Sequence, residues 1–269
     1  MSRLIIALIA VSCSAEPLND AFLRLYNMDF AGAHRILDDY ESTTQRDPLG
    51  PSVRAAAYLF YELDRLKILE SEFLSSDKKI GAEDKLSPDP SIRSRFFESV
   101  ERSQRLATDK LRDHPNDTMA LFSFCMTEGM RTDYMALVEK KQLRSLTYAR
   151  KAHNYALQVI KNDPTFADAY MTTGVTEYLV GSLPFFLKWF IKFDQVEGNK
   201  DTAVARLNRV ATNGRYLGPF AKVLLAIIHV REKRPEQSMK LLAELSRDFP
   251  ENRLYRNELA KLSAKLKRK

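Results

Sequence analysis

The sequence predicts an all-α fold, and three observations lead to this prediction. Only 9 of the 269 residues are glycine, and the runs of β-branched residues that are typical of strands are few. Apolar residues recur three and four positions apart over long stretches, as they do on the buried face of a helix. Pro115, Pro164 and Pro250 each follow such a stretch closely, and proline stops a helix. We therefore expect about five helical hairpins and a C-terminal capping helix.

Residues 1–15 differ from the rest of the chain and are predicted to be a secretory signal peptide. Arg3 supplies one positive charge, residues 4–11 form a short apolar core, and small residues precede Glu16. The apolar run is too short to span a bilayer. A buried first helix is the alternative interpretation. A signal peptide implies an exported protein, which would be periplasmic, secreted or lipid-anchored at the envelope.

Cys13 suggests a second way of processing this segment. Residues 10–13, Ala-Val-Ser-Cys, resemble a bacterial lipobox, in which the cysteine is lipidated and becomes the new N-terminus. A lipobox normally has leucine where Ala10 stands, and this favours simple cleavage after Ala15. In either case Cys125 is the one cysteine left in the domain. No disulfide can then form within it, so stability has to come from packing.

The first third of the chain is expected to contain three helices and an exposed loop. Two short helices are predicted at residues 17–28 and 30–43. A long helix is predicted over residues 52–74, because an apolar stripe runs from Ala56 to Leu69 at helical spacing. Residues 75–90 are charged, lack apolar periodicity and contain two prolines, and they are predicted to form an exposed loop.

The remaining two thirds should consist of helices separated by the prolines and by one insert. Ser91 is expected to cap the first of these helices, and an apolar insert occupies residues 182–198. The helices are expected at residues 91–114, 117–141, 143–161, 165–183, 199–212, 220–232 and 235–247, with a last helix from Arg253.

The junction at Pro164 resembles one found in a known family. One helix ends at Asp163 and Pro164, and the next helix has Gly174 midway between Tyr170 and Tyr178. This pattern resembles the helix-to-helix junction of a tetratricopeptide repeat (TPR), in which the small residue lets neighbouring helices approach closely. The intervals from Pro115 through Pro164 and Gly214 to Pro250 are 49, 50 and 36 residues, against about 34 in a TPR unit.

The resemblance implies a right-handed superhelix of TPR-like hairpins, two of them enlarged, that makes a single domain of residues 16–269. An exported protein of this architecture is also loosely similar to the T-component proteins that accompany TRAP solute transporters in bacteria. That similarity rests on arrangement and not on a diagnostic motif.

The sequence contains no pattern that indicates an enzyme. The four histidines lie in different units, and none has a carboxylate or cysteine at the spacing of metal ligands. The glycines form neither a phosphate-binding loop nor a Gly-x-Ser-x-Gly motif. Cys125 is interpreted as a packed thiol. We therefore predict no catalytic residue, no metal and no cofactor.

The net charge of +7 does not indicate a nucleic-acid-binding protein. Lysine and arginine are spread along the chain, apart from a basic tail from Lys261 to Lys269, whereas nucleic-acid-binding proteins concentrate them on one face. The tail is interpreted as a solvated helix end, with a patch for anionic lipid as the alternative.

In TPR arrays the first helix of each hairpin lines a concave groove, and the resemblance assigns ten residues of this chain to that groove. They are apolar and rich in methionine, which is typical of adaptable hydrophobic sites. Either the groove is filled from within by the long inserts, or it holds a hydrophobic ligand such as an apolar peptide, an acyl chain or a partner helix. The ten residues are Met119, Phe122, Met126, Met130, Met171, Val175, Tyr178, Phe220, Val223 and Ile227.

Residues 184–193 form the most apolar part of the insert. Five large aromatic side chains dominate it, four of which are our candidates for a contact, and burying each is worth roughly 1.5–3 kcal/mol, so water is an unfavourable environment for the segment. We expect it to plug the groove, to lie in a membrane interface or to form an oligomer contact, in that order. The four candidate residues are Phe185, Phe186, Trp189 and Phe190.

Two functional classes follow. The first is a non-catalytic binding or scaffold protein of the cell envelope or secretory space, whose TPR-like groove takes a protein or a hydrophobic ligand. The second is a peripheral membrane or envelope-assembly protein that contacts lipid or partner subunits through residues 184–193 and the basic tail. The sequence does not indicate the oligomeric state.

Overall fold

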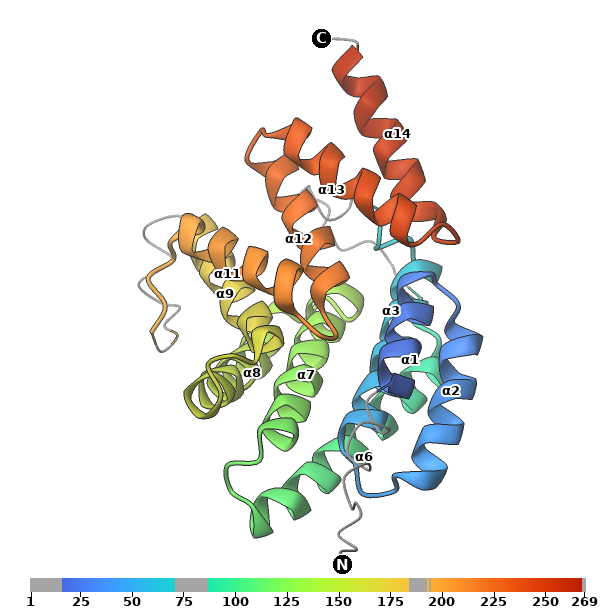
Figure 1. Cartoon of the computed structure of the whole chain (residues 1–269), viewed down its shortest axis with the longest axis vertical. Coiled ribbons are helices and arrows are strands. Elements are labelled where there is room, and N and C mark those ends of the chain that lie inside the picture. The colour runs from blue at the N-terminus through green and yellow to red at the C-terminus, as the bar shows by residue number, and fades with distance from the viewer. Residues whose placement is uncertain (1–15, 71–86, 184–192, 194, 268–269) are drawn as a thin grey trace, which may run out of the picture.

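The computed structural model describes residues 16–70, 87–183, 193 and 195–267. Within these residues the regular structure is helical and contains no strand, which confirms the predicted all-α class (Figure 1). A π-helix, Tyr134–Val138, continues α7, and a short 3₁₀ helix, Ala167–Ala169, precedes α9. The α-helices are α1 (Glu16–Tyr26), α2 (Phe30–Thr43), α3 (Leu49–Arg65), α6 (Pro90–Asp113), α7 (Thr118–Asp133), α8 (Gln142–Asn162), α9 (Tyr170–Ser182), α11 (Lys200–Asn213), α12 (Gly218–Arg231), α13 (Pro235–Asp248) and α14 (Arg253–Lys267).

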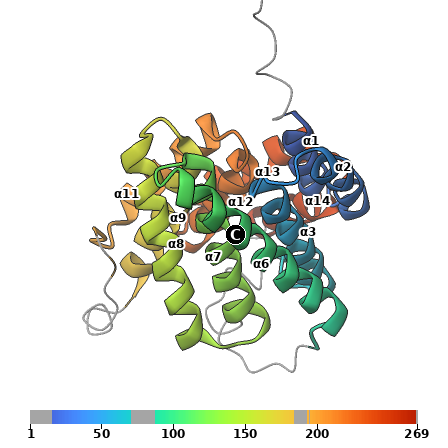
Figure 2. The same cartoon turned by 90° about the horizontal axis from the view of Figure 1, so that it is seen from below.

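Each of these helices packs against the one that follows it in the chain. In addition α1 contacts α3, and α3 contacts α7, so the first helices of successive pairs adjoin one another. In Figure 1 and Figure 2 alike, α1 and α2 lie on one side of the molecule and α8, α9 and α11 on the opposite side. The helices between them, α3, α7 and α12, connect the two sides.

Left-handed residues mark the turn inside each helix pair. After α3, Lys67 has a φ of 60°, and the N–H of Ile68 bonds to the carbonyl of Leu63 at 2.8 Å. After α12, Lys233 has a φ of 58°, and the next N–H bonds in the same way to the carbonyl five residues earlier. This is the Schellman motif, which ends a helix and satisfies its last carbonyls. The residues at the five turns are Met28, Lys67, Lys140, Gln195 and Lys233.

The connections between pairs are built differently. Four of the five contain a proline, and the fifth begins at Gly214. The connection at Gly214, between α11 and α12, is held by Asp168. Its buried carboxylate accepts hydrogen bonds from the backbone N–H groups of Arg215, Tyr216 and Leu217 at 2.7–3.1 Å. Two kinds of turn therefore alternate along the chain. The prolines are Pro48, Pro115, Pro164 and Pro250.

The helix α3 is shorter than the sequence suggested. The prediction of a helix over residues 52–74 is wrong at its C-terminal end, because the left-handed Lys67 stops α3 at Arg65. The apolar stripe continues beyond the helix because this turn folds Ile68 back into the core, where it is fully buried. Residues 71–86, which include most of the expected loop at 75–90, lie outside the described part of the chain.

The prediction that Ser91 caps α6 is wrong. The cap is Asp89, whose Oδ1 accepts the N–H groups of Ser91 at 2.8 Å and Ile92 at 3.2 Å. Pro90 occupies the first turn, where its missing N–H costs nothing. Asp117 caps α7 in the same way through the N–H of Ala120, close to the helix start expected at residue 117.

Two buried glutamates tie the second helix of a pair to the first. The carboxylate of Glu62 in α3 is inaccessible to solvent and accepts the N–H of Asp89, the cap of α6, at 2.8 Å. In α9, Glu177 is 2% exposed and accepts the N–H of Asn199, the cap of α11, at 3.0 Å. Each buried carboxylate is thus satisfied by a loop whose position it fixes.

The first helix closes the chain on itself. The Phe22 ring lies 5.3 Å from that of Tyr216, and the Tyr26 ring lies 5.4 Å from that of Phe249. The side-chain amide of Asn252 donates a hydrogen bond to the carbonyl of Tyr26 at 2.8 Å. Helix α1 therefore packs against two separate segments from the C-terminal third of the chain, around Tyr216 and around Phe249.

Candidate functional site

A cavity of about 1060 Å³ lies among the helices, and we call it the apolar cavity. Its wall comes from α1, α2, α3, α7, α8, α9, α12, α13 and α14, and most of the lining side chains are apolar. The volume is at the upper end of the roughly 300–1,000 Å³ of typical small-molecule sites. Leu179, which is 57% exposed, and the exposed Lys261 and Lys265 belong to the lining, so the cavity opens to solvent.

Five of the ten residues assigned to a groove from the sequence lie together in this wall. Val175 and Tyr178 come from α9, and Phe220, Val223 and Ile227 come from α12. All but Tyr178 are half-buried, so their side chains remain accessible from the cavity. Helix α12 carries apolar residues of its own on all sides, and it can therefore face the cavity and its neighbouring helices at once.

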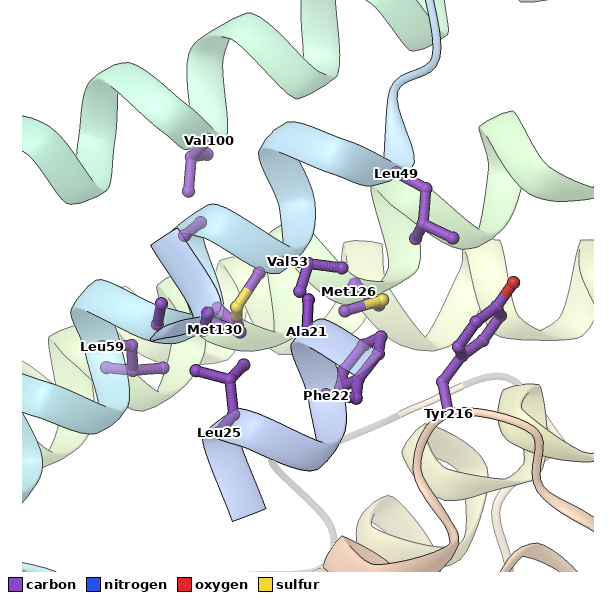
Figure 3. Packing of buried hydrophobic residues seen from close by; sticks show 14 of the residues in the cluster. Ala21, Phe22, Leu25, Leu49, Val53, Leu59, Val100, Met126, Met130 and Tyr216 are labelled. Atoms are coloured by element: carbon purple, nitrogen blue, oxygen red, sulfur yellow. The ribbon is translucent and has the colours of Figure 1, made fainter. Parts of the chain in front are cut away.

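The other five residues lie in the hydrophobic core and are not part of the cavity lining. Phe122, Met126 and Met130 are 0–9% exposed and belong to the cluster that includes Ala21 and Phe22 of α1 (Figure 3). In this part of the molecule α1 covers the face that the resemblance assigns to the groove. Met119 packs against the same cluster, and Met171, 6% exposed, belongs to a second cluster with α11 and α12.

Asp133 is the polar group in the cavity wall that most needs explanation. It is the last residue of α7, it is partly buried in the mostly apolar wall of the cavity, and it makes no hydrogen bond or ion pair with any described residue. Burial alone raises the pKa of its carboxyl to about 7, from a usual value near 4. Ser238 of α13 also lines the cavity, and its buried hydroxyl has no partner within the described structure.

The other charged groups of the wall lie on α12 and α14. The Arg231 guanidinium is 6.0 Å from the centre of the Tyr178 ring, and the Tyr178 hydroxyl donates a hydrogen bond to Glu232 at 3.1 Å. On α14, Lys261 and Glu258 form an ion pair at 3.0 Å. Arg231 and Lys261 therefore have aromatic or acidic partners. Asp133, in contrast, has no hydrogen-bond or ion-pair partner among the described residues.

The cysteine of the domain is chemically inert. Cys125 is 2% exposed, and its Sγ lies 3.1 Å from the Thr172 hydroxyl. Burial raises the pKa of this thiol to about 12, so the thiolate that nucleophilic catalysis requires is scarce at neutral pH. Among the described residues, no three or more histidine, cysteine, aspartate or glutamate side chains are grouped so as to hold a metal ion.

Several of the sequence-based assignments fall outside the described residues. They are Cys13 of the lipobox-like segment and the aromatic residues Phe185, Phe186, Trp189 and Phe190 of the insert. At the two ends of the insert, Leu183 and Phe193 are described, and both line the apolar cavity. No helix in the described ranges combines the length and apolarity needed to cross a membrane.

Comparison with models of known protein families, with curated proteins and with solved structures finds no match to this chain.

Sequence reasoning did not find Asp133 or the contribution of α14. A signal for Asp133 was present, because it is an acid followed by the apolar run Tyr134–Val138. No local signal indicates that Tyr255 and Leu262 of α14 line the same cavity as Leu25 of α1, because those residues meet only through the tertiary fold.

Proposed function

We propose that the protein is a non-catalytic binding protein that holds a hydrophobic ligand in the apolar cavity. The observation that supports this proposal is the cavity itself, because its lining joins residues of nine α-helices, most of them apolar, and remains open to solvent. Interiors are normally packed at crystal-like density, and a volume of this size that the described residues leave unfilled is costly unless something occupies it.

The arrangement we propose for the helices is a TPR-like right-handed superhelix. Two facts support it: left-handed turns within pairs alternate with proline-containing connections between pairs, and α1, α3 and α7 adjoin as the first helices of successive pairs. In this arrangement α9 and α12 present their apolar faces to the ligand, while α1 fills the face in front of α7 from within.

Binding of an uncharged apolar dye, Nile red, tests the proposed function. Val223→Trp puts a large side chain into the cavity and is expected to weaken dye binding at least fivefold. Leu23→Trp is the matched control, because Leu23 lies on α1, is 49% exposed and does not line the cavity. A wild-type protein that leaves the dye in water, or equal binding by the two variants, would contradict the proposal.

We also propose that the protein is exported, with residues 1–15 as the signal. Cell fractionation of the full chain and of a chain without residues 1–15 tests this, and only the full chain should leave the cytoplasm. Metabolic labelling with a fatty acid separates the two ways of processing, because lipidation would require Cys13 and disappear in Cys13→Ser. Cytoplasmic full-length protein would overturn the proposal.

A further inference from the structure

Asp133 stands apart from the other acidic residues of the interior. Glu62, Glu177 and Asp168 are each 0–2% exposed, and each accepts hydrogen bonds from loop N–H groups. Asp133 has no such partner in the described structure, and it lies in a cavity wall whose residues are mostly apolar. An isolated carboxylate in an apolar environment is strongly unfavourable, so its presence there needs a compensating interaction.

The backbone holds Asp133 in this place. The next residue, Tyr134, starts the π-helix, and its ring is fully buried and stacked on Phe96 of α6 with 4.9 Å between centroids. Ala136 and Leu137 of the same π-helix line the cavity together with Asp133. Single turns of π-helix inside α-helices occur frequently at functional sites. Because Tyr134 is anchored in the core, the backbone keeps Asp133 at this place in the cavity wall.

No neighbouring cation neutralises this carboxylate within the described chain. Burial raises the pKa of the Asp133 carboxyl, and no charged group contributes to this shift. The basic side chains in the lining are engaged or exposed elsewhere: Arg231 lies over Tyr178, Lys261 pairs with Glu258, and Lys265 is exposed on α14. A group that forms an ion pair with Asp133 at this part of the wall would therefore have to carry a positive charge.

We infer that the ligand of the apolar cavity is a cationic amphiphile, with an apolar body against α9 and α12 and an ammonium group paired with Asp133. The inference rests on the proposed function and adds the chemistry of the head group. An ammonium ion would complete the ion pair that the fold lacks, and a buried pair with hydrogen bonds offsets the desolvation of both charges. An anionic head group would meet repulsion at the same position.

Three amphiphiles with the same twelve-carbon chain test the inference on the full protein: dodecylamine, dodecanol and dodecanoate. Their affinities are measured by displacement of Nile red at pH 7.5 and low salt, below the concentration at which each forms micelles. We expect the amine to bind at least tenfold more tightly than the alcohol, and the carboxylate to bind more weakly than the alcohol.

Substitution of the acid provides the second readout. Asp133→Asn is expected to lower the ratio of amine affinity to alcohol affinity at least fivefold. Glu128→Gln is the matched control, because Glu128 is another buried acid of α7 that lies outside the cavity lining, and it should leave that ratio unchanged. The ratio does not depend on the fraction of folded protein, since both ligands are measured on the same sample.

The outcomes separate the two proposals. If dodecanol fails to bind the wild-type protein, the proposed function itself is wrong. If dodecanol binds but dodecylamine binds no more tightly, or if Asp133→Asn leaves the ratio unchanged, the cavity holds an apolar ligand and the inference about its charge is wrong. Tighter binding of dodecanoate would also overturn the inference and would point to the lysines of α14.

Discussion

The hydroxyl of Tyr26 donates a hydrogen bond to the backbone carbonyl of Tyr216, which is 2.7 Å away and 190 residues further along the chain. Both groups are buried, so neither has water as a substitute partner. We predict that Tyr26→Phe lowers the free energy of unfolding by about 1–3 kcal/mol, because it leaves a buried carbonyl without its donor. Urea denaturation followed by circular dichroism measures this loss. Tyr61→Phe, at a ring that is 41% exposed, is the control and should change stability much less.

The pKa of Asp133 predicts a pH dependence of stability. Its folded-state pKa is about 7, above the unfolded value near 4, so between these pH values the folded protein binds more protons than the unfolded chain. Stability contributed by this group is therefore lost as the pH rises through that window. Between pH 5 and pH 7 we expect the wild-type protein to lose up to about 2 kcal/mol relative to Asp133→Asn. Thermal unfolding of both proteins across this range is the measurement, and parallel curves would contradict the prediction.

The burial of Cys125 predicts that its thiol is protected. In Cys13→Ser, where Cys125 is the remaining cysteine, we expect a thiol reagent such as Ellman's reagent to react within minutes only after urea is added. Leu179→Cys in the same background is a positive control, because position 179 is exposed and should react in the folded state. Rapid reaction of Cys125 without denaturant would show that the contact between Cys125 of α7 and Thr172 of α9 opens readily.

The left-handed Lys233 predicts a stabilising substitution. A side chain in this conformation costs roughly 1–2 kcal/mol, part of which glycine recovers, so Lys233→Gly should stabilise the protein by about 0.5–1 kcal/mol. Lys240→Gly places the same change in the exposed interior of α13 and should instead destabilise by about 1 kcal/mol. Melting temperatures that move in the same direction for both variants would disprove the proposed role of the turn.

The sequence allowed the all-α class and most helix starts and stops to be predicted, because those depend on local chemistry. The caps of α7 and the stop before Pro164 follow from Asp117 and from the proline ring, whatever the tertiary fold. The end of α3 could not be predicted in this way, because apolar spacing continues through Ile68 and a lysine rarely adopts the left-handed turn that stops the helix.

For the candidate site, the spacing of Phe220, Val223 and Ile227 shows that one face of α12 is apolar, but it does not show what covers that face. Met126 and Met130 have the same kind of spacing, yet α1 covers them whereas α12 borders a cavity. The difference arises from contacts such as that between Tyr26 and Asn252, which join residues 226 positions apart. Periodicity within a helix carries no information on contacts over such separations.

The closure of α1 against the C-terminal third also has a consequence for synthesis on the ribosome. At about 5–20 residues per second, Tyr26 is made roughly 10–45 seconds before Asn252, so the hydrogen bond between them cannot form earlier. Open arrays of helical repeats can fold from any point and propagate. Here the apolar face of α1 has its neighbours from α3 and α7 early but its aromatic partners late, so α1 is incompletely covered in the nascent chain until Tyr216 and Phe249 have emerged.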